Sequence, residues 1–240
     1  MINNYKVLAL VLARGGSKRI PKKNIKELDG KPLIAYSIDE AKKSKYVDRI
    51  ITTTDDPEIK EIALSLGSEA PFLRPDEISN DTATDFPTFV HALKWLDDNE
   101  SYQPDIIVQL RPTSPLRVAQ EIDDAIELLV KNPEADSVRT VTEPDQSPYK
   151  MYKIGEDGFL EPLLRIEGEE ESFNMPQQKL PKAYKHVGYV DVIWRKTIME
   201  RGQMTGTKIL PLVLEKAYSG INKPEEWDYY EFLIRKQKNG

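Results

Sequence analysis

Five basic side chains and two adjacent glycines crowd into one short segment near the N-terminus. The segment, residues 12–24, reads LARGGSKRIPKKN. Glycine lets a backbone N–H approach a phosphate oxygen closely, because no Cβ intervenes. Several cations suit a triphosphate, which carries about four negative charges. The segment therefore predicts a site for a phosphate-bearing anion, with a solvated basic loop as the alternative. Its cations are Arg14, Lys18, Arg19, Lys22 and Lys23.

A buried strand must lead into this segment. Residues 6–13, KVLALVLA, are apolar on both faces, which is typical of a parallel strand covered on both sides. In open α/β sheets, ligands bind at the carboxyl ends of the strands, so this position favours the anion site over the solvated loop. The segment matches neither GxxxxGK[ST] nor GxGxxG, so neither a P-loop nor a dinucleotide-binding fold is indicated.

Strand and helix patterns alternate through the first 143 residues. Pro57 suits the first position of a helix, and Gly67 suits its C-terminal cap. The alternation predicts an α/β fold with a doubly wound, mostly parallel sheet. Further strands are expected at residues 48–56, 104–115, 135–143 and 186–194, and helices at 32–47, 57–68, 84–99, 118–132 and 224–238.

The sequence pattern changes between residues 144 and 186, where prolines, short β-like segments and an acidic run replace the alternation of strands and helices. This part is poorly suited to bury itself. We therefore expect two units: an α/β domain formed by residues 1–143 and 187–240, and an inserted extension formed by residues 144–186.

The composition excludes several classes of protein. The 240 residues carry a formal net charge of −6, and the pI is about 5.2, whereas a duplex-binding protein needs a broad basic face. There is no cysteine, which excludes disulfides, zinc–thiolate sites and thiol nucleophiles. No stretch approaches the roughly 18 apolar residues of a membrane span. We expect a cytoplasmic protein that binds neither nucleic acid nor membrane.

The run LARGGSKRIPKKNIKELDGKPLIAYSI closely resembles the N-terminal signature of acylneuraminate cytidylyltransferases, or CMP-sialic acid synthetases. The likeness continues through IITTTDDPEI, FLRPDEISNDTATD, VQLRPTSPLR and LPKAYKHVGYVDV, and it covers residues 5–230. Relatives in this family activate legionaminic, pseudaminic and Kdo-type sugar acids. The resemblance implies a nucleotide-diphospho-sugar transferase-like fold and transfer of CMP from CTP to the anomeric hydroxyl of a 2-keto-3-deoxy sugar acid, with release of pyrophosphate.

The resemblance also implies roles for the matching residues. Phosphoryl transfer depends mostly on positioning and on neutralising charge, and it needs no covalent nucleophile. Lys18 and Arg14 are expected to act on the phosphates. Arg111 departs from the family pattern and is expected to act beside them by offsetting part of the missing metal-site charge. The expected nucleotide-binding residues are Ala13, Arg14, Gly15, Gly16, Ser17, Lys18, Asn24, Arg74, Ser79, Asp81, Thr82, Thr113 and Ser114.

For the sugar acid the resemblance is thinner, and ordinary packing or surface exposure is the alternative at each position. His186 lies close to these positions in the sequence, and ordinary packing or surface exposure is the alternative there too. Family members use the extension to reach a second subunit, so a homodimer is expected. The positions that resemble acceptor-binding residues are Lys150, Gln178, Tyr184, Tyr189 and Arg117.

Magnesium is expected from the resemblance, but its usual ligands are replaced. Family members carry two aspartates in an IDID run before the last helix, whereas this chain has Gly220 and Asn222 there. An asparagine can ligate a hard cation through its carbonyl oxygen but brings no charge. The chain also has Arg111 where a glutamine is usual. Two readings stay open. In the first, the transferase is active and holds magnesium mainly through the triphosphate oxygens, with Asn222 or a nearby acid such as Asp191 or Glu226. In the second, the chain is a divergent member with little activity that binds nucleotide or serves as a structural partner.

Overall fold

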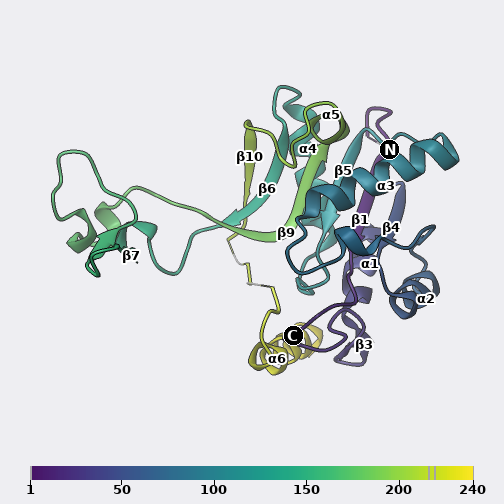
Figure 1. Cartoon of the computed structure of the whole chain (residues 1–240), viewed down its shortest axis with the longest axis horizontal. Coiled ribbons are helices and arrows are strands. Elements are labelled where there is room, and N and C mark those ends of the chain that lie inside the picture. The colour runs from purple at the N-terminus through teal and green to yellow at the C-terminus, as the bar shows by residue number, and fades with distance from the viewer. Residues whose placement is uncertain (1, 216, 219, 240) are drawn as a thin grey trace.

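The computed structural model describes residues 2–215, 217–218 and 220–239. Its centre is a six-stranded sheet in the order β10-β6-β9-β5-β1-β4 (Figure 1). All neighbouring pairs are parallel except those of β9, which runs antiparallel to β5 and to β6. The predicted α/β fold with a mostly parallel sheet is confirmed. The strands are β1 (Val7–Leu12), β4 (Arg49–Thr53), β5 (Ile106–Leu110), β6 (Ser137–Thr142), β9 (Lys185–Trp194) and β10 (Ile209–Val213).

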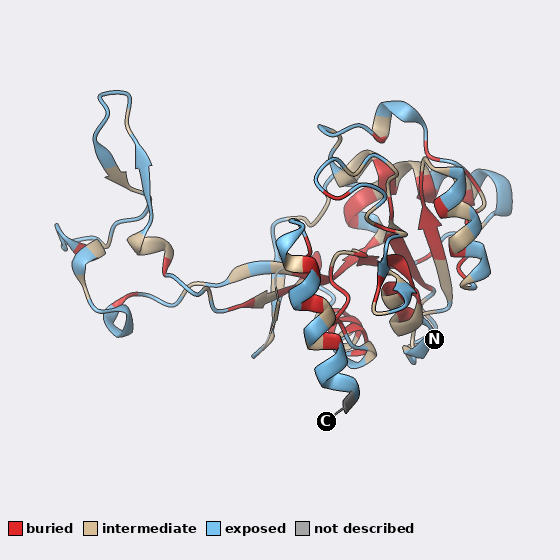
Figure 2. Ribbon diagram, turned by 90° about the horizontal axis from the view of Figure 1, so that it is seen from below, coloured by how far each residue is buried: buried red, intermediate tan, exposed pale blue. Residues whose placement is uncertain are grey.

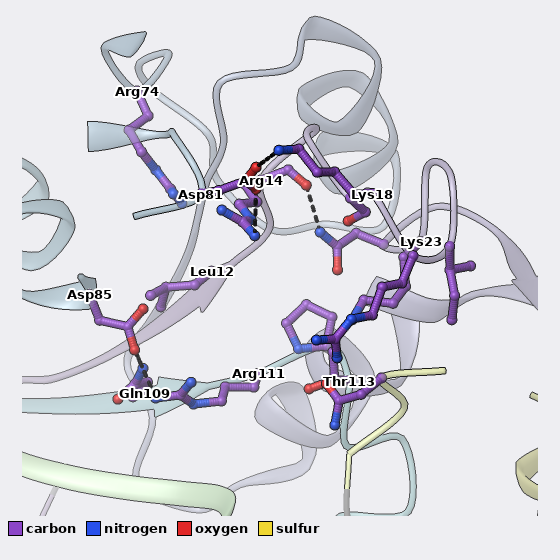
Figure 3. Close-up of a pocket in the computed structure, with 16 residues that line it drawn as sticks. Leu12, Arg14, Lys18, Lys23, Arg74, Asp81, Asp85, Gln109, Arg111 and Thr113 are labelled. Carbon is purple, nitrogen blue, oxygen red and sulfur yellow. Dashed lines mark hydrogen bonds and ion pairs between the residues drawn. The ribbon is translucent and has the colours of Figure 1, made fainter. Parts of the chain in front are cut away.

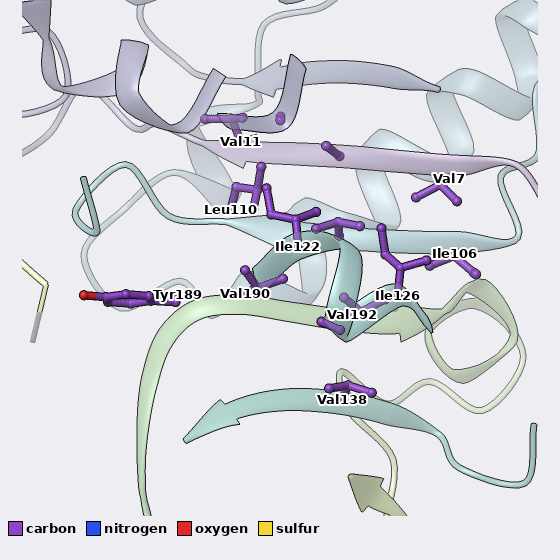
Figure 4. Packing of buried hydrophobic residues seen from close by; sticks show 14 of the residues in the cluster. Val7, Val11, Ile106, Leu110, Ile122, Ile126, Val138, Tyr189, Val190 and Val192 are labelled. Atoms are coloured by element: carbon purple, nitrogen blue, oxygen red, sulfur yellow. The ribbon is translucent and has the colours of Figure 1, made fainter. Parts of the chain in front are cut away.

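Helices cover both faces of the sheet, which explains why the central strands are apolar throughout. Successive side chains of a strand point to opposite faces. Val7 and Val11 of β1 belong to the cluster that includes Ile122 and Ile126, shown in Figure 4, whereas Leu8 belongs to the cluster on the other face. The first face is covered by α1 (Leu33–Lys43), α2 (Pro57–Ser65) and α4 (Ala119–Lys131), and the second by α3 (Asp85–Glu100) and α5 (Arg195–Met199).

The ends of α2 follow the sequence signals. The helix begins at Pro57, and the Asp56 carboxylate accepts hydrogen bonds from two backbone N–H groups of its first turn. Gly67 lies beyond its end with φ of +79°, a conformation that favours glycine. Both predictions for this helix are confirmed.

The extension leaves the body after β6 and returns into β9. It holds the hairpin of β7 (Tyr152–Ile154) and β8 (Leu160–Pro162) and three short 3₁₀ turns, at Pro148–Lys150, Ser172–Asn174 and Gln177–Lys179. Figures 1 and 2 show that it projects away from the body, and that most of its residues are exposed or intermediate in burial. It therefore contributes little to the core of its own chain.

Several elements were not expected from the sequence. These are α5, β10, the small hairpin of β2 (Glu27–Leu28) and β3 (Lys31–Pro32), and a 3₁₀ turn at Asp76–Ile78. The expected C-terminal helix is present as α6 (Glu225–Asn239). Trp227 of α6 donates a hydrogen bond from Nε1 to the carbonyl of Glu27, at 3.2 Å. The last helix is thereby fastened to the segment that follows the basic residues.

Candidate active site

A cavity of about 520 Å³ opens at the carboxyl ends of β1 and β5 (Figure 3). This is the edge at which open α/β sheets bind ligands. The basic segment supplies one wall, and the turn after β5 supplies the other. The lining residues are Leu12, Arg14, Ser17, Lys18, Arg19, Ile20, Lys23, Asn24, Arg74, Asp81, Asp85, Gln109, Arg111, Pro112, Thr113 and Asn222.

The cavity is strongly cationic although the whole chain is acidic. Six arginines and lysines line it against two aspartates, so the formal charge of the lining is +4. A concentration of one sign of charge in a cleft attracts ligands of the opposite sign. The lining thus matches the roughly four negative charges of a nucleoside triphosphate.

Asp81 forms ion pairs with Arg14 and Lys18, two cations of the basic segment. Its carboxylate lies 3.2 Å from Arg14 Nη2 and pairs closely with Lys18 Nζ. Arg14 also donates from Nη1 to the carbonyl of Asn80, at 2.9 Å. The Lys18 hydrogen bond, with the nearby charge of Arg14, lowers the pKa of Asp81. Asp81 therefore stays ionised and keeps both cations at the mouth of the cavity.

The two glycines of the segment differ in their surroundings. A Cβ on Gly15 would lie 2.8 Å from Asp56 Oδ2, whereas a Cβ on Gly16 would meet nothing within 4 Å. The Gly15 N–H donates to Asp55 Oδ1 at 2.9 Å, so this amide is occupied by the protein itself. Gly15 therefore serves close packing against the start of α2 rather than direct contact with a phosphate.

Asn24 has a supporting place beneath the same segment. It is 5% exposed, and its Nδ2 donates to the carbonyl of Arg14 at 2.8 Å. It lines the cavity, as expected, and it also anchors the backbone that carries the cations.

The opposite wall is an ordered polar network around Asp85. One oxygen, Oδ2, accepts hydrogen bonds from Gln109 Nε2 at 2.8 Å and from Arg111 Nη2 at 2.7 Å (Figure 3). Thr113 lies in the turn that follows, and it also lines the cavity. Arg111 is therefore held in one direction before any ligand arrives.

Arg74 contributes a buried cation. It is 7% exposed and donates from Nη2 to the carbonyl of Thr53 at 2.7 Å. Burial lowers the pKa of this guanidinium. Its position in the lining agrees with the expectation that it helps to form the nucleotide pocket.

Two expected acceptor residues lie elsewhere, and the structure contradicts their expected contact with substrate. Arg117 is 2% exposed, and its guanidinium donates to the carbonyl of Tyr189, to Ser37 Oγ and to the carbonyl of Arg111. Burial lowers its pKa to about 10. Tyr189 is also 2% exposed, and its hydroxyl accepts the N–H of Tyr218. Both residues support the framework, and Arg117 fixes the turn that carries Arg111.

Several expected nucleotide-binding residues do not line the cavity. Ser79 is 9% exposed and donates to the carbonyl of Pro75, and Ser114 is 2% exposed. Ala13 is fully buried, since it lies next to β1. These residues hold the walls in place. The expected residues outside the lining are Ala13, Gly15, Gly16, Ser79, Thr82 and Ser114.

The remaining acceptor candidates lie in the extension or at its base. Gln178 lines a separate hollow of about 350 Å³ between the base of the extension and its last turn. Lys150 ends the first 3₁₀ turn of the extension, and Tyr184 precedes β9 with 46% of its surface exposed. None of the three belongs to the cavity lining of the same chain.

Other lining residues were not among the expected nucleotide-binding positions. Arg19 and Lys23 belong to the basic segment that the sequence assigned to an anion, and both line the cavity. Lys23 donates from Nζ to the carbonyl of Ile221 at 3.0 Å, and burial lowers its pKa. Asp85 and Gln109 gave no signal, because the fold alone brings the start of α3 beside the end of β5.

The described residues do not build a metal site by themselves. In the parts of the chain that the structure describes, no three histidine, cysteine or acidic side chains gather at one point. The two carboxylates in the cavity, Asp81 and Asp85, each pair with a cation. Asn222 lines the cavity and donates from Nδ2 to the carbonyl of Gly220, at 2.7 Å. A neutral amide oxygen is thus all that this position offers a cation.

Among the residues that the structure describes, none of the helices has the length and apolarity to cross a bilayer.

Comparison with known proteins gives a family match over most of the chain. A family model described as Cytidylyltransferase matches residues 8–190. A pseudaminic acid cytidylyltransferase of Campylobacter jejuni is 35% identical over 184 residues, 76% of each chain. A CMP-N,N'-diacetyllegionaminic acid synthase of Legionella pneumophila is 30% identical over 232 residues, 95% of this chain and 96% of that protein.

Solved structures show the same fold at low sequence identity. A CMP:2-keto-3-deoxy-manno-octonic acid synthetase complexed with CTP aligns with a TM-score of 0.72 and 15% identity, covering 97% of this chain and 99% of that chain. A 4-diphosphocytidyl-2C-methyl-D-erythritol synthase of Anaerococcus prevotii aligns with a TM-score of 0.62 and 16% identity, covering 96% and 99%. The sheet and its covering helices are therefore a shared framework.

Proposed function

The chain belongs to the cytidylyltransferase family, and from this we propose that it transfers CMP from CTP to the anomeric hydroxyl of a 2-keto-3-deoxy sugar acid of the nonulosonic type. Pyrophosphate is the second product. The names of the pseudaminic acid and diacetyllegionaminic acid relatives support this class of acceptor.

One observation carries the proposal: the +4 lining of the cavity at the carboxyl edge of the sheet. The hydroxyl oxygen of the sugar acid attacks the α-phosphorus, and the bond from this phosphorus to the bridging oxygen breaks. Charge then accumulates on the departing pyrophosphate. Cations that are already in place stabilise that charge without the cost of reorganising them. Lys18 and Arg14 lie on one wall, and Arg111 lies on the other.

Magnesium has a limited place in the proposal. At the position where relatives carry two aspartates, the chain offers only the amide of Asn222, so we propose that Mg²⁺ enters bound to the oxygens of the triphosphate. Arg111, on the wall opposite the basic segment, supplies positive charge that does not depend on the metal. The chain should consequently bind CTP measurably in the presence of EDTA.

We further propose a homodimer joined through the extension. The hairpin of the extension exposes Ile154 (75%), Phe159 (73%) and Leu160 (65%), and Leu163 and Leu164 are also exposed. Exposed apolar groups of this kind are typical of association surfaces. A second copy would also explain how Lys150 and Gln178 reach a sugar acid, since neither lines the cavity of its own chain.

The assembly can be tested by light scattering after size exclusion. The dimer predicts twice the chain mass of 27.5 kDa, and Ile154→Asp with Phe159→Asp should reduce it to the single mass. Mixing Lys18→Ala with Lys150→Ala chains should restore part of the turnover if the two subunits share sites. A wild-type protein of single-chain mass at assay concentration would refute the dimer.

The central experiment measures pyrophosphate release from CTP with a panel of nonulosonic acids and Kdo, with Mg²⁺ and with EDTA. Release that requires both CTP and one acid supports the transferase. CTP binding without release from any acceptor would instead support the other reading, a divergent member that binds nucleotide or acts as a structural partner.

A further inference from the structure

A bulge in β9 places a histidine at the same edge of the sheet as the cavity. Arg139 of β6 pairs with Asp191, but Val141 pairs with His186, so β9 carries extra residues between these points. Gly188 lies within the bulge with φ of +67°. Bulges bend a strand and re-aim its side chains. Since β9 is antiparallel to β5, its beginning lies where β5 ends, and Leu110 pairs with Val190.

The bulge brings His186 onto Asp191. Five positions apart on a regular strand, two side chains would point to opposite faces. Here His186 Nε2 lies 2.9 Å from Asp191 Oδ1 and 3.1 Å from Oδ2. Asp191 is 1% exposed, whereas the His186 side chain is 32% exposed. A buried carboxylate therefore orients a histidine whose ring still reaches the surface.

The exposed ring lies near Arg111, which lines the cavity. The point at which a Cβ on Gly188 would stand lies 3.9 Å from His186 Cε1 and 3.4 Å from Arg111 Cδ. Arg111 is the cavity wall on this side. When Nε2 donates to the carboxylate, Nδ1 is the nitrogen that can accept a proton. In the part of the chain that the structure describes, Nδ1 has no hydrogen-bond partner.

Resting on the proposed function, we propose that the His186–Asp191 pair is the general base for the acceptor. Nδ1 takes the proton of the anomeric hydroxyl while that oxygen forms its bond to the α-phosphorus. The bond to the bridging oxygen breaks, and its electron pair leaves with pyrophosphate. The imidazolium then returns the proton to water. Asp191 is a positioning residue, because it sets the tautomer and stabilises the imidazolium.

The charged groups around this histidine are few. Asp191 lies on its own strand, and Arg139 of β6 approaches that carboxylate at 3.8 Å. Arg111 faces it from the end of β5. The neighbouring Lys185 pairs with Asp145 at 2.8 Å.

His186→Gln is the sharpest test, since the glutamine amide can still donate to Asp191 but cannot accept a proton. We expect kcat to fall about 100-fold or more. The Kd for CTP and the melting temperature should stay close to wild type. The matched control is His91→Gln, at the only other histidine, which lies in α3 against Phe72. It should keep kcat.

A second readout does not depend on turnover. With two histidines in the chain, NMR can follow each ring separately during titration with the acceptor acid in the presence of CMP. The His186 signals should shift and the His91 signals should stay. Unchanged kcat in His186→Gln would overturn the assignment of His186 as the base, as would a loss confined to CTP affinity or stability. Absence of release by wild type with every acceptor would refute the proposed function itself.

Discussion

Arg111 and Asp85 form an ion pair, and neutralising one or the other should change the affinity for CTP in opposite directions. Arg111→Gln removes one of the six cations of the lining, so the formal charge falls from +4 to +3. It also leaves the Asp85 carboxylate, now paired only with Gln109, facing the triphosphate. Asp85→Asn raises the formal charge to +5 and releases the guanidinium from its 2.7 Å partner.

The size of the effect follows from exposure. A hydrogen bond to a charged group contributes about 1.5–3 kcal/mol. The side chains of Arg111 and Asp85 are 39% and 36% exposed, so solvent screens both and the lower end of that range applies. Arg111→Gln should therefore weaken CTP binding about tenfold, since 1.4 kcal/mol corresponds to a factor of ten. Asp85→Asn should tighten binding by a few-fold at most, because exposed ion pairs contribute about 0–1 kcal/mol.

Titration calorimetry with CTP and no acceptor measures both affinities without turnover. The difference in CTP affinity between the two variants should shrink as the salt concentration rises, because salt screens the charge of each side chain. The double variant, at a formal charge of +4, should lie between the two single variants. Wild-type affinity in Arg111→Gln, or weaker binding in Asp85→Asn than in Arg111→Gln, would refute the assignment of Arg111 to the triphosphate.

Three further substitutions test the site and its frame. Lys18→Ala should remove most turnover while thermal melting stays unchanged, because the side chain is 82% exposed; preserved turnover would contradict its role. Gly15→Ala should destabilise the fold by about 1–3 kcal/mol, because its Cβ would stand 2.8 Å from Asp56 Oδ2, whereas Gly16→Ala meets nothing within 4 Å. Equal urea midpoints for the two alanine variants would argue against this packing. Arg117→Met leaves three buried acceptors without their hydrogen-bond donor and should lower the free energy of unfolding by about 2–4 kcal/mol. An unchanged denaturation midpoint would show that this guanidinium is dispensable to the frame.

Local patterns were sufficient for most of the fold. The apolar run before the basic segment became β1, because a strand covered on both faces needs no polar alternation. Pro57 and Gly67 marked the ends of α2, because each acts through its own backbone. By contrast, β10 alternates between intermediate and exposed residues at the edge of the sheet, so its pattern was too weak to predict it.

Part of the site was also readable in the linear chain. Glycines and cations in one segment after the first strand pointed to an anion at the carboxyl edge, and Arg14, Lys18 and Asn24 line the cavity found there. This worked because neighbours in sequence stay neighbours in space on a short turn. The resemblance added Arg74 and Thr113 from distant segments, and a departure from the family pattern pointed to Arg111.

Contacts between distant segments needed the assembled fold. Arg117 was expected among the acceptor-binding residues, but the turn after β5 directs it inward, where it is buried and donates to three acceptors. The bulge that turns His186 onto Asp191 depends on the pairing of β9 with β6, which no periodicity reports. Composition and spacing thus define which charges and turns are available, whereas strand order and register decide which of them meet, since residues far apart in the chain become neighbours only when the sheet assembles.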